Sequence, residues 1–123
     1  MESILTSIKK RLGLTEEYTH FDADIIMEIN TAFFDLNRIG VGPSDGFAIE
    51  DDTSVWTDFI PENAKTVVKE AIKPYIYLQV RHGFDPPAST AHIEAINRRI
   101  TQLESTLNTG VEHMDVTNNE SDN

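Results

Sequence analysis

ENAKTVVKEAIKPYIYLQVRHGFDPP, residues 62–87, is the longest apolar-rich stretch of this 123-residue chain. Its apolar side chains recur every three or four positions and cover more than half of a helical surface. They are Val67, Val68, Ala71, Ile72, Tyr75, Ile76, Leu78, Val80 and Phe84. A helix with so wide an apolar surface needs neighbours on two or three sides, so we predict that it is the central helix of the fold.

Prolines and a glycine set the expected limits of this helix. Pro61 fits the first turn, where its missing N–H has no partner to lose, and Gly83 with the prolines after it ends the helix. Pro74 lies in the interior, where it removes one hydrogen bond and clashes with the preceding turn at a cost of ~3 kcal/mol. We therefore expect a kink, or two helices that abut at Lys73 and Pro74.

Three further segments have helical periodicity and are expected to pack around the central helix. The first covers residues 2–12 and ends at Gly13; the second begins at Asp22, a candidate N-cap, and ends at Gly40. The third begins near Ser89 and carries its apolar residues in an a/d pattern. The sequence predicts a mainly all-α fold, a small bundle of about four helices around a central apolar helix.

A basic triplet, Lys9-Lys10-Arg11, lies at the end of the first helix. Cations suit the C-terminal end of a helix dipole. The triplet is therefore either a solvated face matched to that dipole or a contact for an acidic partner.

Residues 40–60 form a long irregular loop, with three of the six glycines between positions 40 and 46. Phe47 and Ile49 alternate with Ala48 and Glu50, which is a weak strand pattern, so the loop could hold a short β-hairpin. A loop of this length in a small domain commonly binds a partner or becomes ordered on binding.

Charge and length divide the chain into a body and a tail. We assign residues 1–108 to a single helical domain with one hydrophobic core. Residues 109–123 hold four acidic residues and no Lys or Arg, and we expect an acidic tail that is disordered in isolation. The net charge is −11, of which −7 belongs to residues 1–108. Such a charge argues against gripping nucleic acid, because cations supply most of that affinity.

Several function classes are excluded or disfavoured by the sequence. There is no cysteine, hence no disulfide, thiolate metal site or cysteine nucleophile. No apolar run reaches ~18 residues, so we expect no membrane-spanning helix, and the N-terminus lacks the order of a secretory signal.

No residue pattern predicts catalysis or metal binding. The acidic run at positions 50–52 lacks the glycine spacing of a calcium loop, and phosphate-binding, serine-hydrolase and zinc-protease motifs are absent. The histidines share no ligand spacing; they are His20, His82, His92 and His113. We expect no enzymatic activity, no metal and no cofactor.

Eight residues are candidates for an interface with other subunits or with a larger assembly. Trp56 lies among polar neighbours beside the long loop, so it either packs in the core or anchors an interface. Two arginines on the polar face of the last helix could meet the acidic run on a neighbouring copy. The candidates are Trp56, Glu50, Asp51, Asp52, Arg98, Arg99, Val111 and Met114.

Several stretches, in this order, resemble the head–tail connector (adaptor) family of bacteriophages with long non-contractile tails. They are residues 24–44 (DIIMEINTAFFDLNRIGVGPS), 46–51 (GFAIED), 55–60 (VWTDFI), 75–87 (YIYLQVRHGFDPP) and 93–108. The most specific piece is the tyrosine-rich helix that runs into Phe84-Asp85-Pro86-Pro87. Two features depart from the family pattern: Pro74 interrupts a helix that would be continuous, and no bulky aromatic residue lies near Ser105.

The resemblance implies a structural virion protein with a small α-helical fold. Such adaptors form a ring of about twelve copies beneath the portal. They join the portal to a downstream connector or tail protein, and double-stranded DNA passes through the ring without sequence-specific binding. The resemblance also implies a location at the head–tail interface of the virion, assembly in the host bacterial cytoplasm, and no membrane partner.

A second interpretation starts from charge alone. A net charge of −11 would also suit a small acidic regulatory protein, either a DNA mimic or an inhibitor of a basic partner. Binding to a basic protein as a monomer or dimer would favour it.

Overall fold

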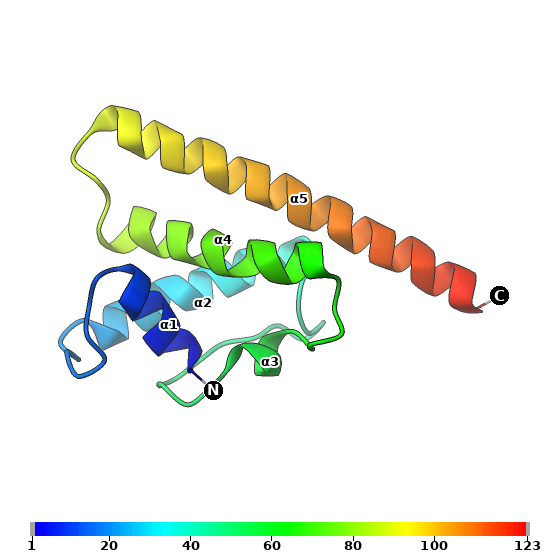
Figure 1. The fold of residues 1–123 in the computed structure, drawn as a ribbon, viewed down its shortest axis with the longest axis horizontal. Coiled ribbons are helices and arrows are strands. Elements are labelled where there is room, and N and C mark those ends of the chain that lie inside the picture. The colour runs from blue at the N-terminus through cyan, green and yellow to red at the C-terminus, as the bar shows by residue number, and fades with distance from the viewer. Residues whose placement is uncertain (1, 123) are drawn as a thin grey trace.

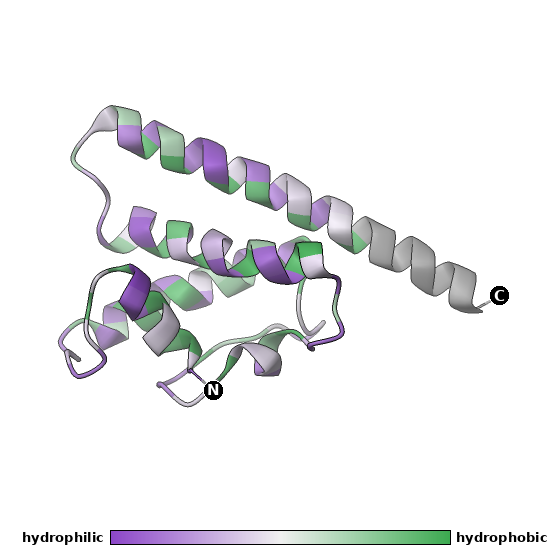
Figure 2. Ribbon diagram, viewed as in Figure 1, coloured by the Kyte–Doolittle hydropathy of each residue, from purple (hydrophilic) through white to green (hydrophobic). Residues whose placement is uncertain are grey.

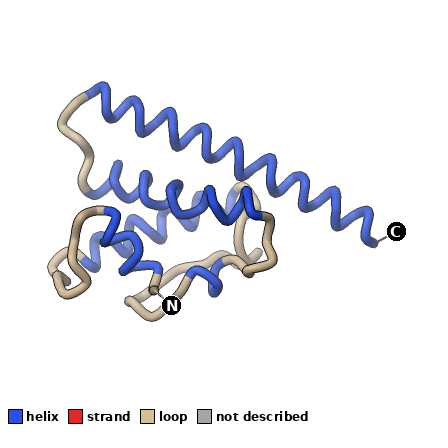
Figure 3. The backbone as a smooth tube through the Cα atoms, viewed as in Figure 1, coloured by secondary structure: helices blue, strands red, loops and turns tan. Residues whose placement is uncertain are grey.

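The computed structural model describes residues 2–122, and the side chains of residues 2–111. The described chain contains five helices: α1 (Ile4–Arg11), α2 (Asp22–Arg38), α3 (Trp56–Phe59), α4 (Thr66–Phe84) and α5 (Thr90–Asp122). In Figure 1, α5 lies along one side of α4, while α1 and α2 lie on the other. Within the described residues there is no strand, as the tube in Figure 3 shows. The predicted all-α fold is confirmed.

Helix α4 is the central helix, as predicted. It contacts α1, α2 and α5, and its buried residues are Val68, Ala71, Ile72, Tyr75, Ile76 and Val80. Each large apolar side chain buried in this way contributes roughly 1.5–3 kcal/mol. Helix α5 is less completely enclosed: in Figure 2 its apolar residues recur on the side that faces α4, and its outer side is polar.

The expectation of two abutting helices at Lys73 and Pro74 is wrong, whereas the alternative, a kink at Pro74, stays a prediction. Helix α4 runs from Thr66 to Phe84 as one element with Pro74 inside it. The residues on both sides of the proline, Ile72 and Tyr75, are buried at 1% and 0% exposure. Packing on three neighbouring helices therefore offsets the ~3 kcal/mol that an interior proline costs.

Three predicted helix limits also differ from the structure. The central helix begins at Thr66 rather than at Pro61, whose carbonyl accepts a turn bond from Ala64 N–H. Gly83 lies inside α4, which continues for one more residue. Helix α5 continues past the expected end at Asn108 to Asp122. The division into a body of residues 1–108 and an acidic tail of residues 109–123 stays a prediction.

The long loop contains no β-hairpin in the described structure. The side chain of Asn30 on α2 takes the place of a strand partner: its Oδ1 accepts from Ile49 N–H at 2.8 Å and its Nδ2 donates to the Ile49 carbonyl at 2.9 Å. The single bridge in this region joins Ser3 to Val55. The alternating pattern around Ile49 therefore buries one side chain, at 2% exposure, without forming a sheet.

The basic triplet is not a uniform solvated face. Lys9 is 2% exposed, and its Nζ lies 2.9 Å from Asp22 Oδ1 and donates to the Glu16 carbonyl at 3.0 Å. Lys10 is exposed and pairs with Glu2. Lys9 is thus neither part of a solvated face nor free to contact an acidic partner, the two alternatives considered for the triplet. Its ion pair joins α1 to the start of α2. Asp22 is the first helical residue of α2, and its carboxylate pairs with Lys9.

Candidate interaction surfaces

The first surface is the acidic loop, which we define as Glu50, Asp51 and Asp52. All three side chains are exposed. Thr53 donates from its hydroxyl (2.5 Å) and its N–H (2.9 Å) to Asp51 Oδ1. These two hydrogen bonds, the hydroxyl first, hold the pKa of Asp51 below its ordinary value. The loop therefore presents a fixed anionic turn.

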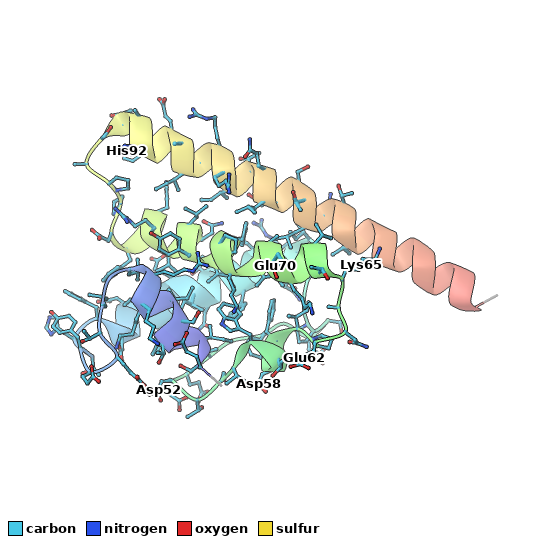
Figure 4. The ribbon with its side chains drawn as sticks, viewed as in Figure 1. Asp52, Asp58, Glu62, Lys65, Glu70 and His92 are labelled. Atoms are coloured by element: carbon cyan, nitrogen blue, oxygen red, sulfur yellow. The ribbon has the colours of Figure 1, made fainter. Side chains whose placement is uncertain are left out.

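The second surface is the arginine pair, Arg98 and Arg99, on the outer side of α5. Both side chains are exposed, and within the described residues neither is in an ion pair. Helix α5 and the acidic loop lie on opposite sides of α4 (Figure 1); in Figure 4, Asp52 and His92 mark the two sides. One chain does not bring these opposite charges together, so a contact between them would need two copies.

The third candidate is Trp56, for which the sequence allows either packing in the core or a role as an interface anchor; the structure shows features of both. The residue is half-buried and packs against the hydrophobic core. Its ring also lies 5.4 Å from Lys73 Nζ, measured to the ring centroid, and borders a hollow. The indole Nε1 is inaccessible to solvent and has no hydrogen-bond acceptor in the described structure.

Val111 contacts the body of its own chain. It is half-buried and borders a groove that also involves Gly42, Phe59 and Val68. A Cβ added at Gly40 would lie 3.1 Å from its Cγ1. The side chain of Met114, the other apolar candidate on α5, lies outside the described residues.

The structure also exposes two apolar residues that the sequence reasoning missed. Met27 and Phe34 are 65% and 66% exposed on the outer side of α2. The guanidinium of Arg38 lies 5.9 Å from the Phe34 ring centroid. A signal was available, because α2 carries apolar residues outside the stripe that faces the core.

Neither a metal centre nor a membrane span is found in the described part of the chain. No group of three His, Cys, Asp or Glu side chains there could hold a metal ion. Of the helices described, none is long and apolar enough to cross a bilayer.

A comparison with protein families gives one match. A family model described as "Phage connector protein" matches residues 4–114, from the first residue of α1 to well into α5. No curated protein and no solved structure matches the chain.

Proposed function

Because the chain belongs to the phage connector protein family, we propose that it joins a phage head to its tail as one subunit of a ring beneath the portal. Membership supports a structural role in the virion and association with other head or tail proteins. The finer proposal comprises a ring of about twelve copies, contacts to the portal on one side and to a downstream connector or tail protein on the other, and passage of double-stranded DNA.

The observation that carries this proposal is the family match over residues 4–114. The placement of charge supports the ring. Head-to-tail rings are heterologous, so every subunit must present two different surfaces to its neighbours. The acidic loop and the arginine pair are opposite in sign and lie on opposite sides of α4. A ring would place the arginine pair of one copy against the acidic loop of the next.

The net charge is consistent with DNA that passes through without being held. A lumen lined by acidic side chains repels phosphates, whereas a basic lumen would bind them. We propose that a chain with a net charge of −11 presents such a surface to the passing genome. Assembly would take place in the host cytoplasm before the tail is joined.

The deciding experiment is size-exclusion chromatography with light scattering, on the chain alone and then mixed with the portal assembly from the same genome. We expect the chain to move into the portal peak at about one copy per portal subunit. A chain that stays separate from the portal at micromolar concentrations would refute the connector ring.

The acidic regulatory protein is the second candidate, and the observation that favours it is the net charge of −11. It predicts a stable one-to-one complex with a basic protein, competed by DNA, and no change of mass with the portal. Competition by DNA is the discriminating readout, because a connector ring has no such competitor.

A further inference from the structure

A hollow bordered by α1, α3 and α4 carries a local charge opposite to that of the whole chain. We call it the cationic hollow; its cavity volume is about 270 Å³, and three of its charged residues are Arg11, Lys69 and Lys73. Two acidic residues also border it; Figure 4 places Glu70 on α4 and Glu62 on the segment between α3 and α4. Its border therefore has one positive charge in excess, in a chain of net charge −11.

The three cations have no carboxylate partner in the described structure. Arg11 lies 5.9 Å from the centroid of the Tyr77 ring, and Lys73 lies over Trp56. Lys69 Nζ donates to the Glu62 carbonyl at 2.6 Å. Weakly engaged cations beside an aromatic ring are a suitable surface for a partner that supplies carboxylates.

Trp56 lies at the border of the hollow and is half-buried, so part of its indole is accessible to a partner. Together with Lys73, whose Nζ lies 5.4 Å from the ring centroid, it presents an aromatic and cationic surface. Ile72 and Pro74 add apolar surface to the border of the hollow. The hollow thus fits a segment in which acidic and apolar side chains alternate over short distances.

The chain itself contains such a segment. Residues 112–116 read EHMDV, in which Met114 and Val116 lie beside the acidic Glu112 and Asp115, and residues 112–123 have four acidic residues and no Lys or Arg. In Figure 1 the C-terminal end of α5 lies beyond the end of α4 and away from α1. The segment therefore leads away from the hollow of its own chain.

We propose that the cationic hollow binds the acidic C-terminal segment, residues 112–123, of a second copy of the chain. The inference rests on the proposed ring, because a head-to-tail ring supplies a neighbour in a fixed orientation. Each subunit would donate its segment to one neighbour and receive a segment from the other.

Trp56 is the only tryptophan of the chain, so its fluorescence reports on the hollow directly. The acceptor is the full chain with its own segment neutralised by Glu112→Gln, Asp115→Asn, Glu120→Gln and Asp122→Asn. A synthetic peptide of residues 112–123 is titrated into it. We expect a saturable change in Trp56 emission. A peptide carrying the same four substitutions should bind at least about tenfold more weakly, because it lacks the charges that pair with the cations.

A pair of matched variants locates the contact. Lys69→Glu with Lys73→Glu in the acceptor should weaken peptide binding by about tenfold or more. Lys10→Glu with Arg38→Glu changes the net charge equally, at two exposed residues outside the hollow, and should leave binding nearly unchanged. The neutral peptide tests the same contact on an unaltered body, so the result stands even where a body variant folds poorly.

Three outcomes overturn the inference: no saturable change, equal binding of the neutral peptide, or equal loss in both variant pairs. A fourth outcome tests whether the segment comes from a second copy.

Dilution separates the copies, so the Trp56 emission of the unmodified chain should approach that of the neutralised chain as the protein is diluted. A difference in emission that persists at every dilution would place the segment in the hollow of its own chain and would overturn the inference. Light scattering with the portal separates the two proposals. If the chain joins the portal but the peptide does not bind, only the inference about the hollow is refuted. If the peptide binds but the chain does not join the portal, the proposed connector ring is refuted.

Discussion

At the scale of single residues, the pair formed by Lys9 and Asp22 is the least exposed ion pair in the described structure. The Lys9 side chain is 3% exposed and that of Asp22 is 26% exposed. Removing one member of a fully buried pair costs ~3–5 kcal/mol, because the other charge stays buried without a partner. Since Asp22 is partly solvated, we expect Lys9→Met to lower the free energy of unfolding by about 2 kcal/mol.

Denaturant unfolding of Lys9→Met, Asp22→Asn and the double variant gives the coupling between the two groups. Lys10→Met is the matched control, because Lys10 is exposed on the same helix, and a surface pair contributes ~0–1 kcal/mol. Equal effects of Lys9→Met and Lys10→Met would contradict a structural role for the buried pair.

The acidic loop allows a prediction about pH. The folded-state pKa of Asp51 is lowered by the two hydrogen bonds from Thr53. A lowered pKa contributes stability that is present above the unfolded value of about 3.9 and is lost as the pH falls through the folded value. We expect Thr53→Val, which removes the hydroxyl donor, to raise the pKa of Asp51 toward the ordinary value. Carboxyl chemical shifts followed by NMR from neutral to acidic pH measure this, and an unchanged Asp51 titration would refute it.

At the scale of elements, two glycines inside helices make a matched pair. A Cβ at Gly110 of α5 would lie 2.8 Å from Val68 Cγ2, whereas one at Gly83 of α4 would lie 2.1 Å from Glu28 Oε2. Alanine favours a helix over glycine by about 1 kcal/mol at either position. The Glu28 carboxylate is the end of a flexible side chain and can turn away, but Val68 is 1% exposed and fixed in the core.

We therefore expect Gly83→Ala to leave stability unchanged or to raise it by up to about 1 kcal/mol. Gly110→Ala should destabilise the fold by about 1–2 kcal/mol, because overpacking outweighs the gain in helix propensity. Thermal unfolding of the two variants under one set of conditions gives the comparison. Two stabilised variants would show that α5 is not held close to α4 at Gly110.

Sequence patterns predict an element well where residues close together in the chain determine it. The spacing of apolar residues in 62–87 is sufficient to predict the central helix. The last helix begins near Ser89, as predicted: α5 starts at Thr90, and Ser89 Oγ accepts from His92 N–H at 3.4 Å. The predictions of abutting helices at Pro74 and of a strand around Ile49 are wrong because the deciding contacts come from elsewhere in the chain. Helix α4, which continues through Pro74, packs on α1, α2 and α5, and Asn30 replaces a strand.

The interaction surfaces were predictable only as residue types. Exposed charge at Glu50 and Arg98 follows from their polar positions. The cationic hollow was not visible, because Arg11, Lys69 and Lys73 are up to 62 positions apart in the chain and meet only through packing of α1 on α4. Burial of Lys9 was missed for the same reason, since its partner belongs to the next helix.

At the scale of the whole molecule, the proposed ring predicts the effect of reversing charge on one side of the subunit. Arg98→Glu with Arg99→Glu should weaken assembly with the portal by about tenfold or more, because like charges would then face each other across the interface. The melting temperature of the free chain should stay nearly constant, since both arginines are exposed and unpaired in the described structure.

Adding Glu50→Arg and Asp52→Arg to this variant exchanges the two charges and should restore assembly, while those two changes alone should also weaken it. Light scattering with the portal measures assembly, and calorimetry measures the melting temperature. If Arg98→Glu with Arg99→Glu lowered both assembly and the melting temperature, or changed neither, the proposed contact between the arginine pair and the acidic loop would be refuted.

The contact between Asn30 and Ile49 has a consequence for crowding. A stretch of extended backbone with free N–H and C=O groups is a template on which another chain can add a strand, which is a common route to aggregation. At Ile49 both groups are already bound by one carboxamide. Many copies can therefore gather at high local concentration without cross-pairing at this point of their loops, and the long loop stays free for specific contacts.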